Sequence, residues 1–222
     1  IYWFKEFLDK VGQDKAILMM HTDPKDGNGQ DLEHILKELK LTEGEVILST
    51  ERIDQKHLGS LYNAVDCTVN ISDAEGFGLA TLESMACGTP IIVNMTGGLQ
   101  EQVTDGENWF GFGIEPVSKA IIGSQEPCSK AVIGSQQVPY IYEDRLNKEQ
   151  FLDAIEQMYV SWQDDGEVYE RWVEKGQKHV KDNYNFEAFC EKWVETMDQI
   201  YEKHGSWENR KNYKSWEFLE LT

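Results

Sequence analysis

The spacing of apolar residues along the first hundred positions predicts helices that alternate with short strands. In residues 1–11 the apolar residues fall on one helical face: Ile1, Phe4, Phe7, Leu8 and Val11. Further helices are predicted at 30–40, 56–64 and 78–87, and short apolar runs predict strands at 15–21, 45–50, 67–71 and 90–94. Short strands that alternate with helices of about ten residues indicate an α/β fold, in which helices cover both faces of a parallel sheet.

The first predicted helix has no capping residue ahead of it, so the chain begins inside an element. In a β-α-β succession this helix would follow a strand, and no strand pattern precedes it. We therefore expect the sequence to be a fragment of a longer protein.

The periodic pattern breaks down between residues 106 and 142, which we interpret as an insertion. It contains a near-repeat, SKAIIGSQ at 118–125 against SKAVIGSQ at 129–136. Two such segments could pair as a hairpin. A local duplication inside a surface insertion is the simpler interpretation, and we prefer it to a binding role.

From residue 147 to 203 the chain reads as a helical tail, with helices expected at 147–161, 165–183 and 185–203. Aromatic residues recur there at helical spacings: Phe151, Tyr159, Trp162, Trp172, Phe186, Phe189 and Trp193. Large aromatics more often form packing surfaces than ligand cages, so we interpret them as packing residues. The pattern does not place the last stretch, SWENRKNYKSWEFLELT.

Composition excludes some classes of function but does not identify the function. The net charge of −19 makes nonspecific nucleic-acid binding implausible, because phosphates would meet a repulsive field. No apolar run approaches the length of a membrane span, and the N-terminus does not have the form of a signal peptide. The four cysteines form no C-x-x-C pair, which argues against zinc and favours a reducing, cytoplasmic setting.

The candidate chemistry lies just after the predicted strand at 67–71. In open parallel sheets, ligands bind beyond the carboxyl ends of the strands, where residues 72–77 are expected. Gly76 and Gly78 permit unusual backbone angles and leave room for a ligand to approach the amides. A helix that starts near Gly78 would point its unpaired N–H groups into that crevice and could hold a diphosphate. Glu83, roughly 7 Å along the helix, could accept hydrogen bonds from sugar hydroxyls, with Glu75 on the other side.

Charge supports this interpretation only in part. Between Lys56 and Lys119 there is no lysine or arginine, so an anionic ligand would be held mainly by backbone dipoles or by cations brought from elsewhere. Two glutamates seven residues apart are also common, so Glu75 as a solvated loop residue and Glu83 on an exposed helix face remain open on these grounds alone.

The same stretch closely resembles the signature of a known enzyme family. Ser72 to Val93 reads SDAEGFGLATLESMACGTPIIV and is followed by Gly97-Gly98-Leu-Gln-Glu101. This pattern, with the preceding LGSLYNAVDCTVNIS, is similar to that of retaining glycosyltransferases of family four, which have the GT-B fold. The resemblance covers residues 5–105 well and the helical tail loosely, and it leaves the insertion uncovered.

The resemblance implies that residues 1–222 are the C-terminal, Rossmann-like half of a GT-B enzyme, whose N-terminal acceptor domain lies outside this chain. The family's C-terminal domain binds a nucleotide-diphospho-sugar as donor. We expect no metal, because no D-x-D motif is placed at a strand end and the helix amides would neutralise the phosphates, and we expect no further cofactor. By resemblance, Glu75 contacts the transferred sugar as the catalytic residue, while Glu83 binds the ribose. The remaining donor-binding residues implied are Gly76, Phe77 and Gly78 for sugar hydroxyls, Leu79 and Ala80 for the diphosphate, and Arg52 and Ile53, more weakly, for the base.

The reaction implied is transfer of a sugar to an acceptor hydroxyl with retention of anomeric configuration. The family's basic residues after the first strand of this domain cannot be assigned, so we expect the fragment alone to bind donor weakly and to transfer little. An alternative is a catalytically inactive nucleotide-sugar-binding or regulatory module. A sugar-nucleotide epimerase or a phosphorylase fits the glycine-flanked pair of glutamates less well.

Overall fold

The computed structural model describes residues 1–27, 29–122, 141–164 and 166–211. They divide into two compact units, Ile1–Lys178 and His179–Thr222, each considered by itself. The strands are β1 (Leu18–His21), β2 (Val46–Ser49), β3 (Thr68–Asn70), β4 (Ile91–Asn94), β5 (Gly111–Ile114), β6 (Ser118–Ile122) and β7 (Ile141–Arg145). The helices are α1 (Tyr2–Val11), α2 (Leu32–Glu38), α3 (Gln55–Tyr62), α4 (Leu79–Ala86), α5 (Leu99–Val103), α6 (Lys148–Gln163), α7 (Gly166–Asn183) and α8 (Phe186–His204).

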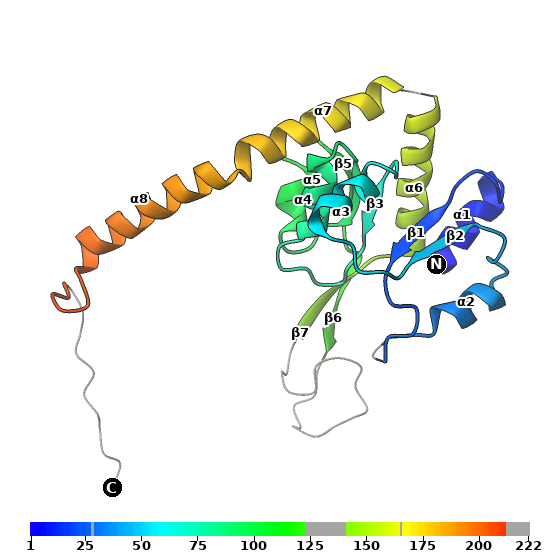
Figure 1. Ribbon diagram of the computed structural model, residues 1–222, viewed down its shortest axis with the longest axis horizontal. Coiled ribbons are helices and arrows are strands. Elements are labelled where there is room, and N and C mark those ends of the chain that lie inside the picture. The colour runs from blue at the N-terminus through cyan, green and yellow to red at the C-terminus, as the bar shows by residue number, and fades with distance from the viewer. Residues whose placement is uncertain (28, 123–140, 165, 212–222) are drawn as a thin grey trace, which may run out of the picture. The chain divides into compact units, whose positions relative to one another are not determined.

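The predicted alternation of helices and strands is confirmed, and the pairing of β1 to β5 is parallel throughout. β1 pairs with β2, and β4 lies between β3 and β5. The single sheet that the pattern suggested is therefore divided in two, because no described strand pairs with both β1 and β3. Figure 1 shows α4 and α5 beside the β3–β4–β5 sheet.

Local capping explains where several helices begin. In each case an Asp or Asn side chain accepts a hydrogen bond from a backbone N–H of the first turn. These caps are Asp31 for α2, Asp54 for α3, Asn147 for α6 and Asn185 for α8.

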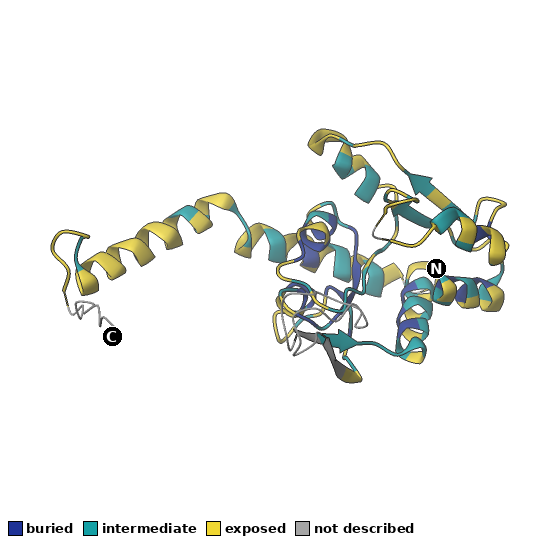
Figure 2. Ribbon diagram, turned by 90° about the horizontal axis from the view of Figure 1, so that it is seen from below, coloured by how far each residue is buried: buried dark blue, intermediate teal, exposed yellow. Residues whose placement is uncertain are grey.

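The core of the first unit joins both sheets through one helix. Leu152 and Ile155 of α6 pack against the cluster around α1, β1 and β2 and also against the cluster that contains Ile92 and Ile114. All four residues of β4 are buried, as expected of a central parallel strand. Figure 2 shows the buried residues gathered in this part of the chain and the residues of α8 largely exposed.

The insertion at 106–142 holds two features that the pattern missed. β5 pairs with β4 in parallel and was overlooked because its sequence, GFGI, contains two glycines, which are uncommon in strands. β6 pairs with β7 in antiparallel orientation, so residues 118–122 do not form a hairpin with the second repeat. The repeat at 129–136 lies outside the described residues.

Candidate functional site

The glutamate stretch lies where the sequence predicted, at the carboxyl end of β3. The chain leaves β3 at Asn70, turns through residues 71–78 and enters α4 at Leu79. Gly78 is the N-cap residue and has φ +84°, a left-handed backbone that glycine adopts without a steric cost. Gly76 has no positive φ, and a Cβ added there would meet no atom within 4 Å.

A second glycine pair, Gly97 and Gly98, supports this turn. The Gly98 N–H donates to the Gly76 carbonyl at 3.2 Å. Gly97 has φ +50°, and a Cβ added there would overlap the carbonyl oxygen of Glu75. The segment after β4 therefore fits against the backbone of the Glu75–Gly78 turn, and only a residue without a side chain allows that approach.

Two buried polar side chains hold the turn from beneath. The Thr81 hydroxyl donates to the Gly78 carbonyl at 2.7 Å and contacts Gln102, and the Gln102 amide donates to the Phe77 carbonyl. Thr81 and Gln102 are both fully buried. Buried hydrogen bonds of this kind are costly to break, so they fix the entrance of α4.

The first turn of α4 presents one exposed face. Leu79 and Ala80 are exposed, and Glu83 lies three and four residues further on, which places it on the same side of the helix. No side chain caps the start of this helix. Backbone N–H groups in a first helical turn have no partner within the helix, and the positive end of the helix dipole lies there. This face therefore combines amide donors with a carboxylate.

Glu83 is held by a neighbouring helix. The Tyr62 hydroxyl of α3 donates to Glu83 Oε2 at 2.9 Å. Burial, with the Glu83 carboxylate beside it, raises the pKa of Tyr62, so the phenol stays protonated and keeps donating. Burial and the same carboxylate raise the pKa of Cys87, which argues against a thiolate near this site.

The other predicted residues divide into two groups. Glu75 is half-buried on the turn and Phe77 is half-exposed, so both lie beside Gly76 and Gly78 as predicted. Arg52 and Ile53 lie on a different loop, between β2 and α3, at the carboxyl end of β2. No hydrogen bond or ion pair within the described residues ties Arg52 to the turn, so its link to the site stays a prediction.

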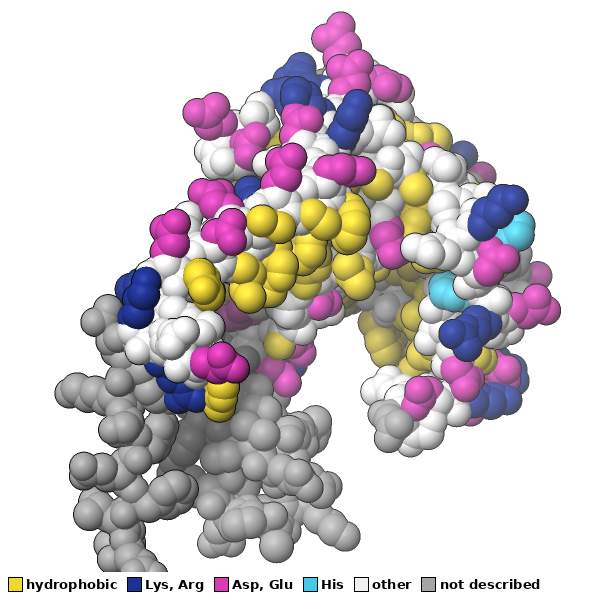
Figure 3. All heavy atoms as spheres, turned by 60° about the vertical axis from the view of Figure 1, so that its left-hand side comes forward, with side chains coloured by type: hydrophobic (Ala, Val, Ile, Leu, Met, Phe, Trp, Pro, Cys, Tyr) yellow, Lys and Arg dark blue, Asp and Glu magenta, His cyan; other side chains and the backbone are white. Residues whose placement is uncertain are grey.

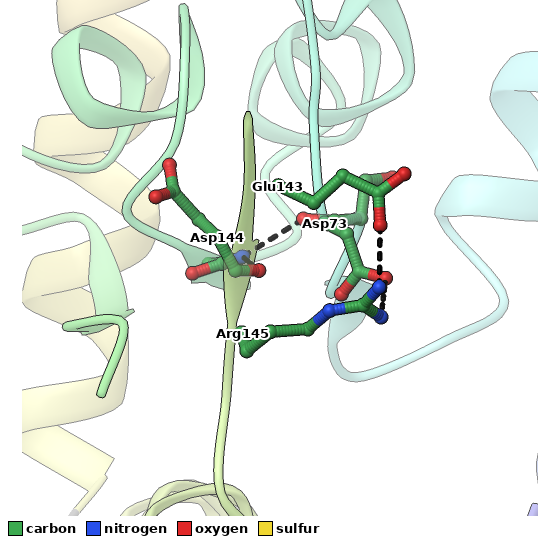
Figure 4. A network of polar contacts seen from close by, with 6 residues as sticks. Asp73, Glu143, Asp144 and Arg145 are labelled. Atoms are coloured by element: carbon green, nitrogen blue, oxygen red, sulfur yellow. Dashed lines mark hydrogen bonds and ion pairs between the residues drawn. The ribbon is translucent and has the colours of Figure 1, made fainter. Parts of the chain in front are cut away.

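A missed feature joins the turn to the strand pair β6–β7. Arg145 at the end of β7 forms ion pairs with Asp73 and Glu143, and the Asp144 N–H donates to the Asp73 carbonyl at 2.7 Å (Figure 4). One signal in the sequence points to it: no lysine or arginine lies between Lys56 and Lys119, so any cation near the motif must come from elsewhere in the chain.

Neither a metal cluster nor a membrane span is present in the parts of the chain that the structure describes. No group of three or more His, Cys, Asp or Glu side chains is arranged there to hold an ion. None of the described helices has both the length and the apolar character that a bilayer crossing requires.

Residues 26–122 match the family model of the group 1 glycosyl transferases. The matched segment contains the turn, α4 and the glycine pair. This part of the chain is similar to the group 1 glycosyl transferases. The resemblance read from the Glu75–Glu83 stretch is thereby confirmed.

Relatives in this family share short segments of the sequence. The D-inositol 3-phosphate glycosyltransferase 2 of Catenulispora acidiphila is 39% identical over 64 residues, which is 29% of this chain and 15% of that protein. The chain thus spans about a seventh of the length of this curated relative.

Solved structures show the fold. The C-terminal domain of the group 1 family glycosyl transferase LpcC from Francisella tularensis has a TM-score of 0.54 and 23% identity, covering 83% of this chain and 78% of that domain. Anabaena Alr3699/HepE in complex with UDP has a TM-score of 0.58 and 17% identity, covering 89% of this chain and 44% of that one. The chain has the fold of one half of these enzymes.

Proposed function

We propose that this chain is the donor-binding half of a retaining glycosyltransferase and that the Glu75–Gly78 turn and the start of α4 hold a nucleotide-diphospho-sugar. One observation carries the proposal: Glu83 lies on the same exposed face of α4 as Leu79 and Ala80, directly after the glycine turn. The match to the family model supports this proposal, as does the similar fold of the Anabaena protein, which was solved in complex with UDP.

Each part of the site has a chemical task in this proposal. The amides of Leu79 and Ala80 face the diphosphate, because a helix N-terminus favours negative charge. Glu83, steadied by Tyr62, accepts hydrogen bonds from the ribose hydroxyls. The amides of Gly76, Phe77 and Gly78 contact sugar hydroxyls, and the loop with Arg52 and Ile53 faces the base.

Transfer breaks the bond between the anomeric carbon and the phosphate oxygen, which leaves with the electron pair. The acceptor oxygen bonds to the same face of that carbon, and its proton passes to the leaving phosphate. Charge grows on the phosphate during this step, and preoriented helix amides stabilise it without reorganising. Glu75 positions the sugar and stabilises its positive charge, and neither a metal nor a cofactor is needed.

The acceptor would lie mainly on an N-terminal domain that this chain does not include. Because the chain spans a small part of its relatives, turnover belongs to the intact enzyme. There, Glu75→Gln is expected to reduce kcat far more than donor affinity. Equal losses in kcat and donor affinity would contradict that role for Glu75.

Calorimetric titration of this chain with UDP, ADP and GDP tests donor binding directly. We expect at least one nucleotide to bind and Glu83→Gln to weaken it about tenfold, since a charged hydrogen-bond acceptor is lost. Glu38→Gln, an exposed glutamate on α2, serves as the matched control and should bind as the parent chain does. Unchanged binding by Glu83→Gln would contradict the assigned role.

A further inference from the structure

The positively charged side chain of Arg145 lies beside the glycine-rich turn, although Arg145 is distant from it in the sequence. Its Nη1 lies 2.6 Å from Asp73 Oδ2, although the two residues are 72 positions apart. Its Nη2 lies 2.6 Å from Glu143 Oε2 on the same strand (Figure 4). The guanidinium therefore connects the end of β7 to the segment that precedes Glu75.

Backbone contacts reinforce this connection. The Asp144 N–H donates to the Asp73 carbonyl at 2.7 Å. The Asn94 amide, fully buried at the end of β4, donates to the Ser72 carbonyl at 2.9 Å and to the Asp144 carbonyl at 3.1 Å. Residues 72 and 73 are thus held to β7 through both backbone and side chain.

The charges show why Arg145 acts on the turn and not on a ligand. Its two terminal nitrogens already face carboxylates, and the group of Arg145, Asp73 and Glu143 has a net charge of −1. A phosphate would have to compete with both carboxylates for the guanidinium. Without Arg145, the Asp73 carboxylate would lie uncompensated two residues before Glu75, beside a site proposed to hold an anion.

We propose that Arg145 is a positioning residue: it holds Asp73 and thereby fixes the backbone that presents Glu75 and the amides of Gly76 to Gly78. This proposal rests on the proposed function for the ligand, but the ordering of the turn can be measured without one. Arginine suits the task because its planar fork binds two carboxylates at once, whereas lysine offers a single ammonium.

The test combines amide hydrogen exchange of the peptide spanning 72–79 with UDP, ADP and GDP titration. We expect Arg145→Met to speed exchange in this peptide about tenfold, with little change in Tm, because one local tie is lost while the core remains. Arg145→Lys should retain part of the protection. The exchanged pair Asp73→Arg with Arg145→Asp should restore much of it, since Glu143 can still face the arginine.

Lys175→Met is the matched control, because Lys175 binds Asn108 on another part of the first unit. It should leave exchange in the 72–79 peptide unchanged. If no nucleotide binds the parent chain and Arg145→Met still loosens the peptide, the proposed function fails and the positioning role stands. Exchange in Arg145→Met equal to that of the parent chain would overturn the positioning role. Loss of protection that neither Lys nor the charge exchange restores would also overturn it, since the effect would then not depend on the ion pair.

Discussion

Two helices with the same kind of sequence have different environments in this chain. α6 and α8 both carry aromatic and aliphatic residues at helical spacing. In α6 part of this face is core: Phe151 is only 5% exposed and lies in the cluster that contains Ile92 and Ile114. In α8 the corresponding face is exposed: Phe186, Phe189, Trp193, Val194, Met197, Ile200 and Tyr201. Figure 3 shows these hydrophobic side chains gathered on one face and bordered by acidic ones.

The difference shows what periodicity can and cannot establish. Spacing identifies a helix and its apolar face, and it does so equally well for α6 and α8. Burial of that face depends on what the rest of the chain provides, and α6 packs against α1 and β5. The interpretation of the tail aromatics as packing residues is therefore confirmed for Phe151. Phe186, Phe189 and Trp193 stack on one another along α8 and are otherwise exposed, so for them the interpretation stays a prediction.

The largest expected effect on stability comes from replacing a phenylalanine by alanine in α6, and the same substitution in α8 should have almost none. Phe151→Ala should lower the free energy of unfolding by about 3–5 kcal/mol, because it leaves a cavity in the core. Phe189→Ala, from a side chain that is 59% exposed, should change it by no more than about 0.5 kcal/mol. Urea unfolding measures both. A loss for Phe189→Ala comparable to that for Phe151→Ala would show that the apolar face of α8 is covered in solution.

A somewhat smaller effect is expected at the turn. Gly97→Ala should cost about 2–3 kcal/mol, because the added Cβ overlaps the Glu75 carbonyl and the backbone is left-handed. Gly76→Ala is the matched control, since Gly76 lies in the facing turn with nothing within 4 Å of the added atom. Equal unfolding midpoints in urea for these two variants would contradict the described fit of the two glycine segments.

The smallest effect depends on pH. Tyr169 of α7 donates to the Asp66 carbonyl at 2.9 Å, and burial foremost raises its pKa to about 12. A tyrosine in the unfolded chain ionises near pH 10. The contribution of Tyr169 to the free energy of unfolding is therefore complete below about pH 10 and is lost as the pH rises toward 12. Tyr169→Phe should cost about 1 kcal/mol at pH 8. The difference in free energy of unfolding between Tyr169→Phe and the parent chain should be smaller at pH 11 than at pH 8. A larger difference at pH 11 would contradict the raised pKa of Tyr169.

Much of the fold was predictable because its elements are locally encoded. The helices at 1–11, 56–64 and 78–87 were predicted within a few residues, since their apolar spacing and caps are local properties. β5 was missed because its two glycines are uncommon in strands. The pairing of β6 with β7 was missed because it joins a strand inside the insertion to one that begins at the insertion's end. The division into two sheets depends on which strand edges meet, and no local pattern records this.

The site was predictable where it is contiguous. Glu75 to Glu83 lies on one turn and one helix, so local rules place it correctly. Gly97, Gln102 and Arg145 contact the turn at residues 73–78 from later segments of the chain. These contacts form only in the folded protein, so no local sequence pattern predicts them. The roles assigned to Arg52 and Ile53, metal independence and a cytoplasmic setting stay predictions.

The central claim is that the turn and the start of α4 bind the phosphates of a nucleotide. Titrating ¹⁵N-labelled chain with UDP, ADP and GDP while recording amide chemical shifts tests it most directly. We expect the largest chemical-shift changes at the amides of Gly76 to Thr81 and of Glu83, and no change at the amides of α8. Shifts that concentrate elsewhere, or no shifts with any of the three nucleotides, would contradict it.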